Sequence, residues 1–140
     1  MPRMNEEPTQ PQRGFVEQVR DVLSHLYDYL YLQTHPLADE LAKNHHLSPQ
    51  ERMLFLRTVM LEAIEDVNPG ARVPLRSLRA RAYNVLDLYY VEGLTIGEVA
   101  RELAVSERQV YRELRRAEGI LATTLWGRRP SQVVMEAESY

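Results

Sequence analysis

A chain of 140 residues, 44% of them hydrophobic, is long enough for one domain or for two small units that share a core. The absence of cysteine excludes a disulfide framework and a cysteine-based metal site. The net charge of −3 is divided unevenly, because residues 1–70 carry 11 acidic and six basic side chains, whereas residues 71–129 carry 11 arginines and seven acidic side chains. A polyanionic partner is therefore expected to contact the second half of the chain.

Residues 1–13 are polar and contain prolines, which predicts a disordered tail. They have no apolar core of the kind found in signal peptides, and no apolar run in the chain approaches the ~18 residues that span a bilayer. We therefore expect a cytoplasmic protein that does not associate with a membrane.

The segment from Gly14 to Tyr31 is predicted to form one helix, because its apolar residues recur at spacings of three and four. Pro36 interrupts this pattern and is expected to begin a short helix that ends near Lys43. Tyrosines at three alternate positions would spread around the first helix, so ordinary packing is favoured over an aromatic ligand pocket. These tyrosines are Tyr27, Tyr29 and Tyr31.

The clearest helix start is Ser48, which is followed by Pro49 at the first helical position and by Glu51 at the third. The helix is predicted to end near Val67 and is apolar around most of its circumference, which requires burial on more than one side. The turn at residues 68–70 then separates a first unit, residues 14–70, from a second unit, residues 71–127. The first unit is interpreted as a dimerisation module, a sensor for a ligand or protein, or a structural collar.

A helix from Pro74 to Val91 is predicted to lead into two short helices joined by a tight turn, LTIGEVARELAVSERQVYREL, which begins at Leu94. The helix starts, Thr95 and Ser106, are 11 residues apart, and this spacing fits a helix-turn-helix. Glutamate or glutamine stands three residues after each start, so both starts are predicted to be capping boxes. The fold class is therefore all-α, with an N-terminal helical bundle and a tri-helical helix-turn-helix unit whose last helix is extended.

The side chains that face outward on this unit are suited to duplex DNA. Arginine can bond guanine at two atoms, glutamine can pair with adenine, and the first turns of a recognition helix lie nearest the base edges. The residues expected to contact bases are Ser106, Glu107, Arg108, Gln109 and Arg112. The residues expected to contact phosphates are Thr95, Arg101, Arg115 and Arg116.

The stretch from Tyr83 to Ser106 resembles the promoter-reading domain, region 4, of bacterial sigma-70-type factors. The resemblance is carried by an aromatic, acidic, glycine and leucine series before the helix-turn-helix, and it extends over about residues 74–126. It implies binding of duplex DNA and regulation of transcription. The turn position that is usually glycine is Ala104, so this turn must accept a side chain. Nothing in residues 1–70 resembles the sigma region that binds core polymerase, so a complete sigma factor is not expected.

The helix that follows Ser106 keeps its apolar spacing as far as Leu125, well beyond the length that reads DNA. Gly127 is expected to end it, leaving residues 128–140 as a tail. This extension and the helix that ends at Val67 are two large apolar surfaces in a small chain. They predict burial between two chains, and therefore a homodimer that presents two recognition helices to the DNA.

No motif in the sequence indicates catalysis, so we do not expect an enzyme, and we expect no cofactor. The four histidines lack metal-site spacing, because no two of them are four residues apart, and no metal site is expected. The histidines are His25, His35, His45 and His46. The function predicted from sequence is a DNA-binding transcriptional regulator. The alternative is a protein-interaction module with a sigma-like fold that binds RNA polymerase or another regulator, with weak or no DNA binding.

Overall fold

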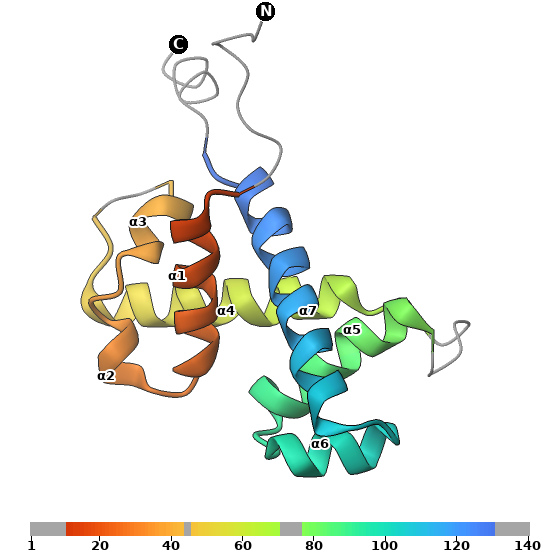
Figure 1. Cartoon of the computed structure of the whole chain (residues 1–140). Coiled ribbons are helices and arrows are strands. Elements are labelled where there is room, and N and C mark those ends of the chain that lie inside the picture. Colours follow the sequence, from red (N-terminus) through yellow and green to blue (C-terminus); the bar gives the residue numbers. More distant parts are fainter. Residues whose placement is uncertain (1–10, 44–45, 71–76, 131–140) are drawn as a thin grey trace, which may run out of the picture.

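The computed structural model describes residues 11–43, 46–70 and 77–130. These residues form an all-α fold and contain no strand, as the sequence predicts (Figure 1). Most of them belong to seven α-helices and one π-helical turn. In chain order these are α1 (Arg13–Ser24), α2 (Tyr29–Leu32), α3 (Leu37–Leu41), α4 (Pro49–Val67), α5 (Leu78–Leu86), the π-helical turn η1 (Asp87–Val91), α6 (Ile96–Leu103) and α7 (Glu107–Gly127).

The first predicted helix is divided into α1 and α2, so the prediction of one helix as far as Tyr31 was wrong. The backbone N–H of His25 bonds the carbonyl of Val22 at 3.0 Å and closes α1. A new helix start follows, at which the Asp28 carboxylate accepts from the backbone N–H of Tyr31 at 3.2 Å. A side-chain cap of this kind stabilises a helix start in the middle of an apolar pattern. One consequence is that Leu30, one of the apolar residues of the predicted helix, is 77% exposed.

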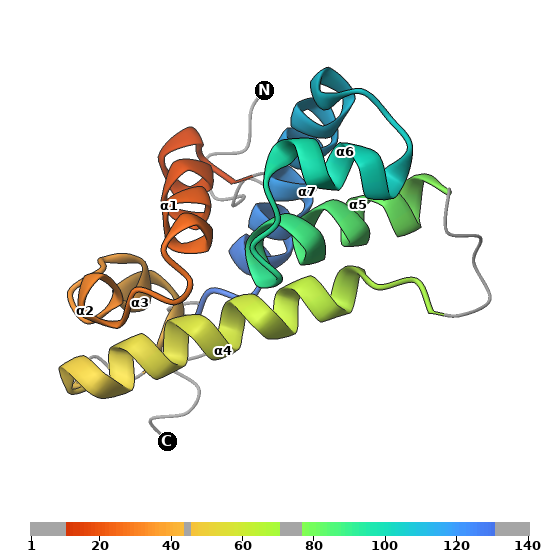
Figure 2. The same cartoon turned by 90° about the horizontal axis from the view of Figure 1, so that it is seen from below.

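Helix α4 begins as predicted. The Ser48 hydroxyl accepts from the backbone N–H of Glu51 at 3.1 Å, and the Glu51 carboxylate accepts from the backbone N–H of Ser48 at 2.9 Å. Seen from below, α4 crosses beneath the rest of the molecule (Figure 2). It packs against α2, α3, α5 and α7, so its apolar circumference is covered from several sides within one chain. Short helix α3 lies beside it and buries Leu37 and Leu41.

Helix α7 is the central element of the fold, because it packs against α1, α4, α5 and α6. Its apolar extension is buried inside the chain: Leu121 and Leu125 are inaccessible to solvent, and the Trp126 ring meets the Phe15 ring edge-on at a centroid distance of 4.9 Å. Of the two apolar surfaces from which a dimer interface was expected to draw, this one is therefore covered within the chain. A single core cluster includes residues from both sides of the turn at residues 68–70.

Helix α5 begins at Leu78 under a cap from Ser77, whose hydroxyl accepts from the backbone N–H of Ala80 at 3.1 Å. The predicted start at Pro74 lies outside the described residues. At Asp87 the helix widens into η1, where the N–H of Glu92 bonds the Asp87 carbonyl at 2.8 Å. An i to i+5 turn of this kind shifts the faces of a helix. As a result Tyr90 is buried, whereas Tyr89 is half-buried.

Candidate nucleic-acid interface

Helix α6 begins at the predicted capping box. The Thr95 hydroxyl accepts from the backbone N–H of Glu98 at 3.2 Å, and the Glu98 carboxylate accepts from the backbone N–H of Thr95 at 2.9 Å. These hydrogen bonds lower the pKa of Glu98 below its ordinary value. Val99 and Ala100 are the buried residues of α6, and the small Ala100 side chain leaves room for the neighbouring helix.

The turn between α6 and α7 has the backbone of a helix-turn-helix. Ala104 has φ of 56° and ψ of 45°, which is the left-handed conformation. The backbone N–H of Val105 then bonds the carbonyl of Ala100 at 3.0 Å, which satisfies a carbonyl at the end of α6. The usual turn is therefore kept although Ala104 carries a Cβ. The Ala104 side chain is exposed, so nothing in the core compensates for the strain.

Helix α7 begins at Ser106, but this start is only half of the predicted capping box. The Ser106 hydroxyl accepts from the backbone N–H of Gln109 at 3.1 Å. The return bond is missing, because the Gln109 amide nitrogen donates to the Glu113 carboxylate at 2.8 Å. In a capping box the side chain of Gln109 would accept a hydrogen bond from the backbone N–H of Ser106. The Gln109 amide instead donates to a carboxylate, and hydrogen bonds to an ionised group are stronger than those between neutral groups. The prediction of a second capping box was therefore wrong.

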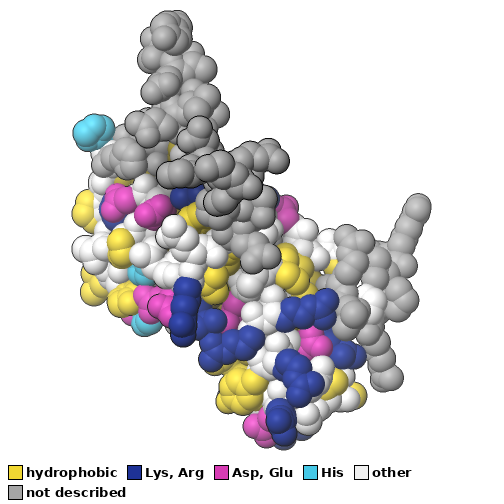
Figure 3. Space-filling model, turned by 45° about the horizontal axis from the view of Figure 1, so that its top comes forward, with side chains coloured by type: hydrophobic (Ala, Val, Ile, Leu, Met, Phe, Trp, Pro, Cys, Tyr) yellow, Lys and Arg dark blue, Asp and Glu magenta, His cyan; other side chains and the backbone are white. Residues whose placement is uncertain are grey.

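The outer face of α7 is basic. Arg108, Arg112, Arg115 and Arg116 are all exposed over its first three turns. Figure 3 shows Lys and Arg side chains gathered over the part of the molecule that contains α6 and α7. The other predicted contact residues on this side are exposed too, apart from Gln109, which is half-buried. These exposed residues are Thr95, Arg101, Ser106 and Glu107.

Sequence reasoning missed an aromatic residue on this face. The Tyr111 side chain is 56% exposed and stands next to Arg112 in sequence. Tyr111 follows the buried Val110 and so lies outside the apolar spacing of α7. This position in the sequence indicates that its side chain is exposed. An exposed aromatic ring among arginines adds apolar contact area and a hydroxyl donor to the surface.

Behind this face, two carboxylates of α7 are buried, and neither was expected. Glu118 is 3% exposed and receives a hydrogen bond from Arg20 at 2.7 Å and one from the Tyr90 hydroxyl at 2.5 Å. Burial and this bond raise the pKa of Tyr90 above its ordinary value. Glu113 is 5% exposed, with Arg81 at 3.5 Å. Both glutamates occupy positions of α7 at which the apolar spacing predicts burial. A charged residue at such a position is the feature of the sequence that could have identified them.

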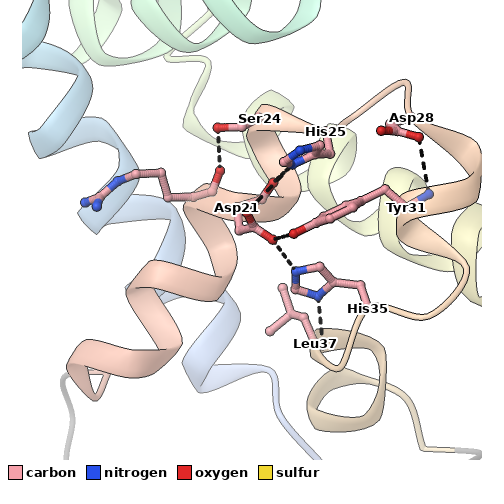
Figure 4. Close-up of polar contacts among 8 residues, drawn as sticks. Asp21, Ser24, His25, Asp28, Tyr31, His35 and Leu37 are labelled. Carbon is pink, nitrogen blue, oxygen red and sulfur yellow. Dashed lines mark hydrogen bonds and ion pairs between the residues drawn. The ribbon is translucent and has the colours of Figure 1, made fainter.

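His25, which follows the end of α1, and His35, which lies between α2 and α3, form part of a separate polar cluster (Figure 4). The Asp21 carboxylate accepts from the Tyr31 hydroxyl at 2.5 Å and lies 2.9 Å from His35 Nε2. Because His35 Nδ1 accepts from the backbone N–H of Leu37 at 3.1 Å, the proton of this ring is on Nε2, which donates to Asp21. The cluster therefore ties the loop before α3 to α1.

The charge of this cluster is set by the same bonds. Burial raises the pKa of Asp21, but the hydrogen bonds from Tyr31 and His35 outweigh that effect and hold the pKa below its ordinary value. The His25 ring stacks on Tyr31 at a centroid distance of 3.8 Å. Among the described residues, no group of three His, Cys, Asp or Glu side chains is arranged to hold a metal ion. His45 lies outside the described residues.

The fold and the basic face together define a helix-turn-helix unit of the DNA-binding type, built from α5, η1, α6 and the first half of α7. Residues 75–119 match the family model described as Sigma-70, region 4, so the resemblance seen in the sequence is confirmed for this segment. The N-terminal half has no family match. No curated protein and no solved structure matches the chain. None of the helices in the described ranges is long and apolar enough to cross a membrane.

Proposed function

We propose that this chain is a transcriptional regulator that binds a specific duplex-DNA sequence through α7. The observation that carries the proposal is the row of exposed arginines on α7, held outward by a helix-turn-helix of the sigma-70 region 4 type. Region 4 domains bind DNA and RNA polymerase. A regulator of this class acts where the chromosome lies, so the proposal includes a cytoplasmic location. It includes no catalytic activity.

The proposed contacts follow from position along α7. The helix start lies deepest in the major groove, so Arg108 and Arg112 are proposed to bond base edges. Arg115 and Arg116 lie further along the helix and are proposed to bond phosphates. The other members of each set keep the roles expected from the sequence. They are Ser106, Glu107 and Gln109 for bases, and Thr95 and Arg101 for phosphates.

The test begins with selection of bound duplexes from a random pool, followed by measurement of Kd against salt concentration. Arg108→Ala and Arg112→Ala should each weaken the selected site by ~1–3 kcal/mol and relax preference at one base position. Arg115→Ala or Arg116→Ala should weaken all duplexes alike and reduce the salt slope by about one.

Arg13→Ala is the matched control for these variants. Arg13 is a highly exposed arginine at the start of α1, near the end of α7 that lies away from α6 (Figure 1). Its removal should change neither affinity nor slope. Binding by the wild-type chain that does not depend on salt or sequence would refute the proposal.

A homodimer remains part of the proposal, although the apolar side chains Leu121 and Leu125 of α7 are already covered within the chain. The large apolar side chains that stay most exposed among the described residues include Leu30 and Leu54, at 77% and 54%. Recovery of a palindromic site and a mass of two chains by sedimentation would support two recognition helices per complex. A monomer on a single half-site would refute this part alone.

A second candidate function is a protein-interaction module that binds RNA polymerase or another regulator. The acidic balance of residues 1–70 favours it, because acidic side chains repel DNA and suit a basic protein surface. This function requires saturable binding to purified polymerase by a chain that shows no salt-sensitive affinity for duplex DNA. The salt titration therefore separates the two candidates.

A further inference from the structure

The exposed ring of Tyr111 has no partner inside the chain. Its side chain is 56% exposed on α7, and in the part of the chain that the structure describes nothing bonds its hydroxyl or stacks on its ring. The other exposed tyrosines among the described residues are each engaged. The hydroxyls of Tyr27 and Tyr31 donate hydrogen bonds, and a guanidinium group lies over the ring of Tyr29. Packing and hydrogen bonding within the chain therefore do not explain Tyr111.

The position of Tyr111 places it among the arginines of α7. Arg108, Arg112 and Arg115 are exposed, and with Tyr111 they have the spacing i, i+3, i+4 and i+7. Residues with this spacing lie on one face of a helix. Because α7 begins at Glu107, this face starts in its first turn, the part of a recognition helix that lies nearest the base edges. The Tyr111 ring therefore faces the same groove as the arginines if α7 binds DNA.

An aromatic ring and a guanidinium group suit different parts of a base edge. In the major groove the base edges present hydrogen-bond donors and acceptors, and the apolar group among them is the C5-methyl group of thymine. Arginine bonds the polar groups, whereas a ring gains most where it removes apolar surface from water. A phosphate offers the ring no such gain, because the ring would displace water from a charged group. Thymine is therefore the base that suits the Tyr111 ring.

We propose that Tyr111 is a specificity-determining residue that selects thymine at one position of the DNA site, through contact of its ring with the thymine C5-methyl group. This inference deepens the proposed function and rests on it, because it requires α7 to lie in the major groove. The ring supplies the contact, and the hydroxyl is not needed for it.

The test removes the methyl group from the DNA and the ring from the protein, separately and together. Each thymine of the selected site is replaced in turn by uracil, which differs from thymine only in lacking the C5-methyl group. For the wild-type chain, one such replacement should weaken binding roughly fourfold, the worth of one buried methyl group. Tyr111→Ala should bind the thymine and uracil forms of that position equally, whereas Tyr111→Phe should keep the wild-type ratio.

Tyr29→Ala is the matched control, because Tyr29 is 52% exposed but lies on α2. It should leave the ratio of thymine to uracil affinity unchanged at every position. Because the Tyr111 ring is exposed, Tyr111→Ala should keep the wild-type midpoint of urea denaturation. Tyr111→Gln is a second variant without a ring, and it should lose the ratio as Tyr111→Ala does.

A wild-type chain that selects no thymine, or that binds every uracil form as tightly as the thymine form, would overturn the inference. Variants without the ring that keep the ratio at every thymine would overturn it too. Loss of the ratio in Tyr111→Phe would show that the hydroxyl makes the contact, which also contradicts the inference. Each of these results leaves sequence-specific binding intact. A wild-type chain without sequence-dependent binding would overturn the proposed function, and the inference with it.

Discussion

Replacement of Ala104 by glycine should stabilise this protein, because the residue is held in a left-handed conformation with φ of 56°. That conformation costs a residue with a Cβ ~1–2 kcal/mol. Glycine removes the strain but adds ~0.4–1 kcal/mol of chain entropy to the unfolded state. The Ala104 methyl group is exposed, so its removal loses little packing. The expected gain in free energy of unfolding is therefore ~0.5–1 kcal/mol.

Gly93 provides the reciprocal experiment at the other end of α6. It has φ of 77°, and a Cβ added there would meet no atom within 4 Å. Gly93→Ala therefore introduces the strain that Ala104→Gly removes, without a steric clash. We expect it to destabilise the chain by a similar ~0.5–1 kcal/mol. The double variant should lie close to the wild type, because the two positions share no contact.

Both changes are measured by urea denaturation, followed by far-ultraviolet circular dichroism. A thermal melt gives a second measurement, in which ~1 kcal/mol corresponds to a shift of about 2–4 °C in Tm for a chain of this size. A destabilised Ala104→Gly variant, or two shifts of the same sign, would refute the view that the turn is strained at Ala104. DNA affinity should be unaffected by Ala104→Gly, because the change keeps the path of the backbone.

Two further predictions concern polar groups. Tyr90→Phe should lower the free energy of unfolding by ~1.5–3 kcal/mol, because it removes a hydrogen bond to the buried carboxylate of Glu118. Tyr89→Phe, whose hydroxyl has no partner among the described residues, should change it by less than ~0.5 kcal/mol, and an equal loss in both variants would contradict this account. Hydrogen bonds from Thr95 lower the pKa of Glu98, so its contribution to stability is complete above the unfolded value near 4.5 and is lost as the pH falls through the lower folded value. In urea titrations, the deficit of Glu98→Gln should therefore be full at neutral pH and shrink in acid, and a deficit independent of pH would show that the charge is not involved.

The parts of the fold that could be predicted from sequence are those that depend on neighbours along the chain. The starts of α4 and α6 are set by residues three positions apart, so Ser48 with Glu51 and Thr95 with Glu98 identify them without a tertiary structure. The start of α7 shows where this logic ends. The Gln109 side chain could bond the backbone N–H of Ser106 or the carboxylate of Glu113, and it bonds Glu113. The burial of that carboxylate depends on tertiary packing, which the local sequence does not reveal.

Apolar spacing predicts which face of a helix is buried, but it does not say what covers that face. Leu121 and Leu125 were correctly identified as buried, whereas the covering partner proved to be the same chain, through α1 and its neighbours. The ion pair of Arg20 with Glu118 joins residues 98 positions apart, which no local pattern can reveal. The exposed arginines of α7 could be identified from the sequence, because the exposed face of a helix follows from its apolar periodicity.

The position of α7 leads to a last prediction, which tests the division of the chain near residue 70. The same helix exposes arginines at its start and carries Leu121, Leu125 and Trp126 into the core that it shares with α1. Removal of residues 1–70 would expose these three side chains, at a cost of roughly 5 kcal/mol or more.

That cost is comparable to the whole stability of a small domain. We therefore expect residues 71–140 alone to lose most of their cooperative unfolding transition and their DNA affinity, and addition of separately produced residues 1–70 to restore both. The measurements are urea denaturation and duplex binding of the fragment, each with and without its complement. A fragment that unfolds cooperatively and binds DNA as the full chain does would show that the helix-turn-helix is an independent domain, and that the contacts between α1 and α7 are not needed for its fold.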